Sequence, residues 1–367
     1  MFFRKKQKQV ETNDEPSTSS AISLALKAHL GIESSDLIQV VISAKEISIS
    51  LPIPSTLDEA TILEVLQERG LIPSGYQCRV ASNIPMFAAK QALVTNVKNI
   101  VAVSSGKGGV GKSATAVNLA LALTKLGARV GILDADIYGP SVPIMLGTTN
   151  ASPESNDNKT MQPIHAHGMV SNSIGYLVDN EHASIWRGPM ASKALQQLVN
   201  ETKWPLLDYL IVDMPPGTGD IQLTMAQNIP LTAAVVVTTP QDIALSDAGK
   251  GIAMFEKLDI PVVGIVENMS FFECPSCHTQ SPIFASGGAS KLGSRYKLPV
   301  LAEVPINMQI RENADNGHSL FADHSNTHLQ DIYLDAARSM AANMVNKIKV
   351  SQVAIASGGG IDITRLD

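Results

Sequence analysis

The stretch Gly-Lys-Gly-Gly-Val-Gly-Lys-Ser at residues 106–113 decides the fold class of this chain. It matches the phosphate-binding pattern G-x-x-x-x-G-K-[ST], whose glycines let backbone N–H groups turn toward phosphate oxygens. An apolar run rich in β-branched residues precedes it at 99–105, and a run rich in Ala and Leu follows it at 114–126. These flanks predict a buried strand before the loop and a helix after it, which is the setting that a nucleotide phosphate site requires.

The residue types in the loop predict separate roles. Lys112 is expected to reach the β- and γ-phosphates, and the Ser113 hydroxyl to ligate Mg²⁺. A second lysine, Lys107, follows the first glycine and raises the question of which further phosphate it contacts. The residues expected to bind the nucleotide are Gly106, Lys107, Gly108, Gly109, Val110, Gly111, Lys112, Ser113 and Ala114.

Composition narrows the class of protein. With 367 residues the chain predicts about two domains, and 44% apolar with 17% charged residues is typical of a globular protein. The net charge of −6 provides no basic field for nucleic acid, and no run of 18 apolar residues predicts a membrane span, so neither partner is expected. Three cysteines and no secretory signal favour a reducing, cytoplasmic location.

The sequence divides into parts of different character. We expect a disordered arm at 1–19, a small α+β domain at 20–83, a linker at 84–97, a P-loop ATPase domain at 98–349 and a flexible tail at 350–367. In the ATPase domain, apolar strands alternate with helical stretches, which predicts an α/β fold with a mostly parallel sheet and helices on both faces. The candidate strands are 101–104, 130–133, 209–212, 234–238, 262–266 and 300–304.

Acidic residues follow two of these strands, at the sheet edge where ligands bind in such folds. Asp213, after the strand at 209–212, is expected to hold Mg²⁺. Asp136 is expected to orient the water that attacks the γ-phosphate, because phosphoryl transfer depends mainly on positioning and charge. Asp134 either has a structural role or assists the metal.

A resemblance follows from these motifs. The doubled-lysine loop, Asp134-Ala-Asp136 and Asp213-Met-Pro-Pro-Gly resemble the deviant Walker ATPases of the MinD/ParA (SIMIBI) class over about residues 96–345. The resemblance implies that Lys107 crosses a dimer interface to the partner's nucleotide and takes part in catalysis with Lys112 and Asp136. It also implies that Asn268, in Glu267-Asn-Met-Ser270, recognises adenine.

The pair Cys274-Pro-Ser-Cys277 provides two thiols that can bind one soft metal. A zinc ribbon needs four ligands, and the chain has no second pair; a thioredoxin-like redox pair usually opens a helix, whereas Pro275 and the polar residues after Cys277 predict a loop. The third interpretation is half of a Cys₄ site, with two thiols from each of two protomers, which is the ligand count of a [4Fe–4S] cluster.

With Trp186-Arg-Gly-Pro-Met190 added, the motif set resembles the Mrp/ApbC family of ATP-dependent iron–sulfur cluster carriers. The resemblance implies an ATPase that forms a homodimer, binds a labile [4Fe–4S] cluster through Cys274 and Cys277, and passes it to apo iron–sulfur proteins. Residues 20–83 have the size of that family's N-terminal domain but lack its Asp-Pro segment, so Cys78 receives no role. His278 stands where the family commonly has Gly. The alternatives are a MinD/ParA-like positioning ATPase acting on membrane or DNA, and a zinc-stabilised regulatory ATPase.

Overall fold

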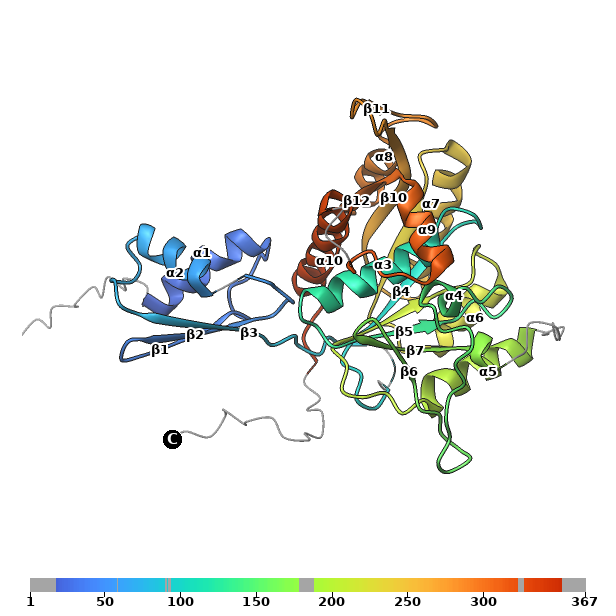
Figure 1. Ribbon diagram of the computed structural model, residues 1–367, viewed down its shortest axis with the longest axis horizontal. Coiled ribbons are helices and arrows are strands. Elements are labelled where there is room, and N and C mark those ends of the chain that lie inside the picture. The colour runs from blue at the N-terminus through green and yellow to red at the C-terminus, as the bar shows by residue number, and fades with distance from the viewer. Residues whose placement is uncertain are drawn as a thin grey trace, which may run out of the picture. The chain divides into compact units, whose positions relative to one another are not determined.

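The computed structural model describes residues 18–57, 59–89, 91, 94–177, 188–322 and 327–351. Residues 1–17 of the expected arm, 352–367 of the expected tail, and Trp186 with Arg187 lie outside this set. The described residues form two compact units, the first built from Leu57–Ala81 and the residues up to Leu51, the second from Pro52–Thr56 and the residues from Ser82 onward. Figure 1 follows the chain through both units.

The first unit is a small α+β domain. Its elements are α1 (Thr18–Leu30), β1 (Gln39–Ser43), β2 (Glu46–Leu51), α2 (Glu59–Glu68) and β3 (Gln77–Ser82), with strand order β1-β2-β3. Alternate residues of β2 are buried, as a strand with one face on a core requires. Cys78 lies in this core with 4% exposure, and burial raises its thiol pKa to about 11. It is a core residue of this domain.

The second unit contains a nine-stranded sheet. The strands are β4 (Ile100–Ser105), β5 (Val130–Asp134), β6 (Ile164–Ala166), β7 (Met169–Ser173), β8 (Tyr209–Asp213), β9 (Ala233–Thr238), β10 (Val262–Glu273), β11 (Gln280–Ser281) and β12 (Val300–Ile306). They follow the order β11-β10-β9-β4-β8-β5-β7-β6, and β12 also pairs with β10. Pairing is parallel except at β6 and β11. Each of the six expected strands lies within one of these.

Helices cover both faces of this sheet, as predicted. On one face α3 (Lys112–Lys125) packs against α10 (Thr327–Lys347). The other face buries a large apolar cluster beneath α5 (Gly188–Glu201), α6 (Asp220–Asn228), α7 (Asp242–Lys257) and α8 (Gly288–Tyr296). The shorter elements are α4 (Val142–Met145), the 3₁₀ turn η1 (Ile174–Tyr176) and α9 (Met308–Asn316). The strands β4, β5, β8 and β9 are buried at every position, which explains why they read as continuous apolar runs.

The segment expected as a linker is anchored to the second unit at residues 84–88. Ile84 and Phe87 are buried, at 2% and 0% exposure. The Phe87 N–H donates to Asn99 Oδ1 at 3.0 Å, and Asn99 Nδ2 donates to the Pro85 carbonyl at 2.9 Å. Ser351 N–H donates to the Met86 carbonyl at 2.8 Å, so the last described residue is fixed beside the same segment.

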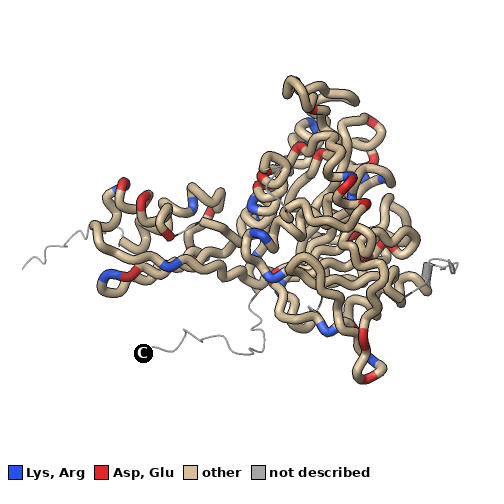
Figure 2. The backbone as a smooth tube through the Cα atoms, in the orientation of Figure 1, with Lys and Arg blue, Asp and Glu red and all other residues tan. Residues whose placement is uncertain are grey.

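Charge is spread over the described surface. Figure 2 shows Lys and Arg positions interspersed with Asp and Glu positions in both units. Within the described residues, no helix has the length and apolar character needed to cross a bilayer.

Candidate nucleotide site and cysteine hairpin

The glycine-rich loop connects β4 to α3 at the carboxyl end of the parallel strands. Its backbone packs so closely that side chains do not fit at two of its glycines. A Cβ on Gly106 would lie 2.1 Å from the backbone carbon of Asp247, and a Cβ on Gly111 would lie 2.0 Å from Asn268 Nδ2. Gly111 also has φ +79°, which disfavours other residues there. The loop is therefore a tightly packed part of the fold, held between α7 and β10.

Lys112 brings the expected catalytic and metal residues together. Its Nζ lies 2.6 Å from Asp213 Oδ1, 3.1 Å from Ser113 Oγ and 3.7 Å from Asp136 Oδ2. The lysine side chain is 6% exposed and that of Asp213 is fully buried. Residues about 100 positions apart in the sequence thus converge on one ammonium group.

The charges around Lys112 are unbalanced toward the negative. Asp134 and Asp213 lie side by side at the ends of β5 and β8, and Asp136 follows two residues later. Burial raises the pKa of the Asp213 carboxyl and of the Asp136 carboxyl, and the Lys112 ammonium opposes both rises. Asp213 Oδ2 is buried and has no hydrogen-bond partner among the described residues. Excess carboxylate charge, a free hard oxygen and the Ser113 hydroxyl suit a divalent cation such as Mg²⁺.

The carboxylate of Asp134 has different partners from those of Asp136 and Asp213. Its Oδ1 accepts from the Asp136 N–H at 3.1 Å, and its Oδ2 accepts from the backbone N–H groups of Ser141 and Val142 and from the Ser173 hydroxyl, at 3.0, 3.1 and 3.1 Å. Burial first, and the neighbouring Asp213 second, raise its pKa to about 7. Of the two roles left open for Asp134, the contacts favour the structural one, because both oxygens hold the turn that carries Asp136.

The signature lysine Lys107 makes its contacts within its own chain. Its carbonyl accepts from the Ser105 hydroxyl at 2.9 Å, and its Nζ donates to Gln241 Oε1 at 3.4 Å, just before α7. Its side chain is half-buried. Asn268 also contacts the loop, since its Nδ2 donates to the Val110 carbonyl at 2.9 Å.

The cysteine pair lies in the turn of the hairpin formed by β10 and β11, so the predicted loop is confirmed. Cys274 N–H donates to the Thr279 carbonyl at 3.1 Å and closes the turn. Cys274 is half-buried and Cys277 is exposed, and both are free thiols. Hydrogen bonding to Thr279 and to Cys274 lowers the pKa of the Cys277 thiol to about 7. A turn between antiparallel strands does not open a helix, which removes the main structural feature of a thioredoxin-like pair.

His278 does not join the thiols. Its Nδ1 lies 3.0 Å from Glu273 Oε1, and its backbone has φ +56°, a left-handed conformation that glycine adopts most easily. That conformation accounts for the Gly expected there in related sequences. Among the described residues, no cluster of three or more His, Cys, Asp or Glu side chains could hold a metal ion. The described part of one chain therefore offers this hairpin two ligands.

Comparison with known proteins places the chain in a family of P-loop NTPases. The sequence profile of the ParA family described as NUBPL iron-transfer P-loop NTPase matches residues 96–341. The chain belongs to this family. It is 59% identical over 251 residues to the iron–sulfur cluster carrier protein of Escherichia coli K12, covering 68% of each chain. It is 45% identical over 264 residues to the mouse iron–sulfur cluster transfer protein NUBPL, covering 71% of this chain and 81% of that one.

Solved structures give the same fold for this P-loop NTPase. A nucleotide-binding protein from Archaeoglobus fulgidus in complex with ADP is 35% identical, with a TM-score of 0.56 over 62% of this chain and 90% of that one. The cell division ATPase MinD from Pyrococcus furiosus is 20% identical, with a TM-score of 0.50 over 66% of this chain and 98% of that one. The second likeness concerns the fold alone.

Some residues around the NTPase site are not apparent from its motifs. Gln222 of α6 is 1% exposed and donates to the Ser104 hydroxyl at the end of β4, while the Gly217 N–H donates to the Ser105 carbonyl at 3.0 Å. These two contacts fasten both sides of the turn at 215–219, which follows Asp213. The motifs also did not indicate that Gln241 contacts Lys107 or that Glu267 holds the strand beside the loop. The available signal was a polar residue at a buried position of its element, and this becomes visible only when the packing is known.

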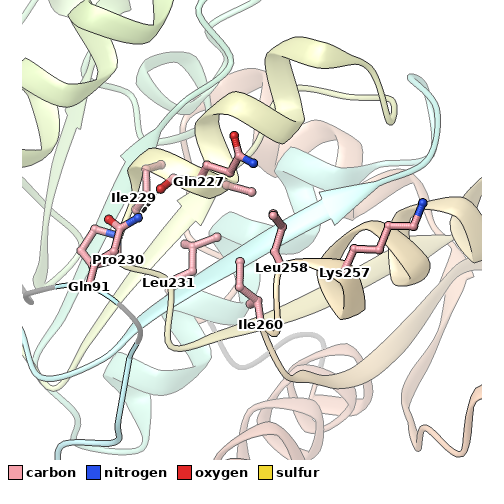
Figure 3. A pocket seen from close by; sticks show the side chains of 9 residues that line it. Gln91, Gln227, Ile229, Pro230, Leu231, Lys257, Leu258 and Ile260 are labelled. Atoms are coloured by element: carbon pink, nitrogen blue, oxygen red, sulfur yellow. Dashed lines mark hydrogen bonds between the residues drawn. The ribbon is translucent and has the colours of Figure 1, made fainter.

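The second unit also has a pocket at the amino end of the parallel strands, beside the residues that precede β9 and β10. Figure 3 shows Ile229, Leu231, Leu258 and Ile260 lining it, with Lys257 at its side. Gln91 Nε2 donates to the Gln227 carbonyl across one wall. Most of its described lining residues are apolar, and Lys257 is the one charged residue among them. It lies away from the phosphate loop and offers no catalytic group.

Proposed function

We propose that this protein binds and hydrolyses ATP and carries a labile [4Fe–4S] cluster, held between two protomers, to apo iron–sulfur proteins. The observation that carries the proposal is the hairpin at Cys274 and Cys277, which presents two thiols on the same sheet that carries the phosphate loop. A [4Fe–4S] cluster takes four cysteine ligands, so a second copy of the hairpin would complete the set. The names of the bacterial and mouse relatives support a role in iron–sulfur transfer.

For the nucleotide, five residues of the site would have separate roles. Lys112 would contact the terminal phosphates, since its ammonium is already held by Asp213 and Asp136 in a buried position. Ser113 and Asp213 would hold Mg²⁺, which when bound neutralises phosphate charge. Asp136 would hold the attacking water, because its carboxylate is fixed by the turn that Asp134 organises. Asn268 would contact the adenine from the strand beside the loop.

The homodimer would give Lys107 its function. Within one chain, the Lys107 ammonium makes only a long hydrogen bond, 3.4 Å, to the neutral Gln241 side chain among the contacts described. A full positive charge at the mouth of a phosphate site is favourably placed to meet the phosphate of a nucleotide bound by a second copy. The same two-fold pairing would bring the two cysteine hairpins together, so that nucleotide and cluster sites share one interface.

The decisive experiment is anaerobic reconstitution with iron and sulfide, followed by quantification of iron, sulfide and zinc in the whole protein. We expect about four irons per dimer, with loss of the cluster absorbance in Cys274→Ala and in Cys277→Ala. Cys78→Ala is the matched control, because that thiol is buried in the other unit and should leave loading unchanged. Full loading in both hairpin variants, or stoichiometric zinc in place of iron, would overturn the proposal.

A further inference from the structure

The strand β10 contacts the phosphate loop through Asn268 and leads directly into the cysteine hairpin. We propose that Asn268 and Glu267 of β10 are positioning residues that transmit the nucleotide state of the phosphate loop to the cysteine hairpin, with Met269 as the hinge. This inference rests on the proposed function for its purpose, the control of cluster access. Its physical content, that nucleotide changes the exposure of the hairpin thiols, requires no cluster.

The first link is between the loop and β10. Asn268 Nδ2 donates to the Val110 carbonyl at 2.9 Å, and the same amide nitrogen fills the space where a Cβ of residue 111 would lie. The backbone of the phosphate loop at Val110 and Gly111 is therefore in direct contact with the Asn268 side chain, with no space between them. A movement of the Val110 carbonyl on phosphate binding would require Asn268 to follow or to give up its hydrogen bond.

The second link is a change in how β10 is held. Up to Glu267 the strand pairs in parallel with β9, and from Val266 to Asn268 it pairs in regular parallel register with β12. Met269 then takes φ +55°, and the register with β12 shifts before Phe272. Beyond that point Phe272 pairs with both β11 and β12, and Glu273 pairs with β11, so β10 ends at the hairpin labelled β11 in Figure 1. Positive φ is uncommon for a non-glycine residue, and hinges are residues that absorb a change in φ and ψ, so we place the hinge at Met269.

The third link is the carboxylate of Glu267, which spans the hinge. Glu267 is fully buried; its Oε1 accepts from the Ser270 hydroxyl at 2.7 Å, and its Oε2 accepts from the Ala289 N–H at 2.5 Å at the start of α8. Gly288 leaves little room beside it, since a Cβ there would lie 3.2 Å from Oε2. The carboxylate thus ties the residues on either side of Met269 to one helix, and sets the direction in which the hairpin leaves the sheet.

The distance along the chain is short enough for this path to act directly. Six positions separate Asn268 from Cys274, and Cys277 lies at the exposed tip of the same hairpin. A rotation at Met269 would change the exposure of both thiols while β9 and the first part of β10 stay in place. Each nucleotide state would then favour one orientation of the hairpin, to the extent that it binds that state more tightly.

The test is the alkylation rate of Cys277 in the full chain without cluster, at one fixed pH. The rate is compared without nucleotide, with saturating Mg–ADP, and with a saturating ATP analogue that resists hydrolysis. For the natural sequence we expect rates with the two nucleotides to differ by about fivefold or more. Asn268→Ala and Met269→Gly should bring that ratio close to one, with nucleotide binding and the thermal midpoint measured on the same samples.

Asn307→Ala is the matched control. It removes an asparagine that caps α9 after β12, through the Gln309 N–H at 2.8 Å, and it lies off the path. We expect it to keep the full rate ratio. Met269→Gly serves as the second hinge variant, because glycine adopts positive φ without strain and leaves the contacts of Asn268 and Glu267 in place.

Two results would overturn the inference. One is an alkylation rate in the natural sequence that is the same in every nucleotide state. The other is a full rate ratio in Met269→Gly, which would show that the hinge is not the coupling element. Neither depends on iron: a protein that binds zinc but keeps a nucleotide-dependent rate would fail the proposed function and support the coupling, while normal iron loading with a nucleotide-independent rate would do the reverse.

Discussion

The phosphate loop and the cysteine hairpin lie on the same sheet, and they are built in opposite ways. Around Lys112 the ligands come from β8 and the turn after β5, all in one chain, and the ammonium is 6% exposed. In the hairpin, Cys277 is exposed, and its thiol donates a hydrogen bond to the Thr279 hydroxyl in the same turn. One site is assembled by the fold of a single chain, whereas the other offers a partial set of ligands. The carboxylates around Lys112 are thus supplied by the fold of one chain, whereas the described part of one chain supplies only two thiols at the hairpin.

The contrast also predicts how each region responds to mutation. A buried charge depends on its partners, because removing one leaves the other unpaired in a medium of low dielectric constant. An exposed thiol is solvated with or without its neighbours, so changes there alter reactivity much more than stability. Substitutions at Lys112 test the buried charges of the phosphate site, and a substitution at Thr279 tests the exposed thiol of the hairpin.

The largest effect is expected at Lys112. Lys112→Met should lower ATP turnover by on the order of 10³-fold, because the phosphate charge loses its closest ammonium. It should also destabilise the fold by about 3–5 kcal/mol, because Asp213 and Asp136 lose their buried counter-charge. Steady-state ATPase assays and urea unfolding measure the two effects separately.

Lys112→Met combined with Asp213→Asn is the control for the charge argument. It removes one carboxylate together with the ammonium, so stability should recover in part while turnover stays lost. The alkylation rate of Cys277 without nucleotide should be unchanged in both variants. A Lys112→Met protein as stable as the natural one would contradict the account of the buried charge set.

A smaller effect is expected at Lys107, the half-buried lysine at the start of the loop. Lys107→Ala should lower the turnover number by about 10–100-fold and change the nucleotide dissociation constant by less than about threefold, because the interaction forms on dimer closure. Gln241→Leu, which removes only the hydrogen bond within the chain, should keep turnover near the natural value. Equal turnover in Lys107→Ala and the natural sequence would exclude a shared nucleotide site.

The sequence predicts the two regions unequally, and the reason is physical. The loop, its flanking strand and helix, and the acids after 130–133 and 209–212 follow from local patterns, because parallel strands place their carboxyl ends on one edge. The role of Asp134 could not be read in this way, since its four donors come from three separate segments. The strand β7 was missed because Ser171, Asn172 and Ser173 are polar yet fully buried, each satisfied by hydrogen bonds.

The cysteine hairpin was also only partly predictable from local sequence patterns. The hairpin follows the long strand β10, which spans Val262–Glu273. Only 262–266 was expected as a strand. The backbone of Met269, with φ +55°, departs from regular strand geometry within the remainder. The positive φ at His278 and the contact of Asn268 with the loop depend on tertiary packing. Neither has a signal in the residue types alone.

A pH effect is expected at Asp134. Its pKa is about 7 in the folded protein and about 3.9 when unfolded, so between pH 4 and 7 the folded state holds a proton that the unfolded state has lost. The stability from this group is full below about pH 4 and is lost as pH rises toward 7, by up to about 1.4 kcal/mol per unit. Asp134→Asn does not titrate, so the difference in urea midpoint between the two proteins should change across this window and be constant above it. Parallel curves would contradict the raised pKa.

The smallest effect is expected in the hairpin. The Thr279 hydroxyl lies 3.3 Å from Cys277 Sγ and is the first cause of the low pKa, about 7, of that thiol. Thr279→Val removes the hydroxyl and keeps the backbone N–H, so the pKa should rise part of the way toward the ordinary value, and alkylation at pH 7 should slow by about three- to tenfold. Site-resolved mass spectrometry from pH 6 to 9 measures this, and the buried Cys78, which should stay unlabelled throughout, is the internal control. An unshifted profile would mean that the thiol is activated by the turn backbone and Cys274 alone. The hairpin would then depend on its fold as much as the phosphate loop does, and the contrast between the two regions would be weaker.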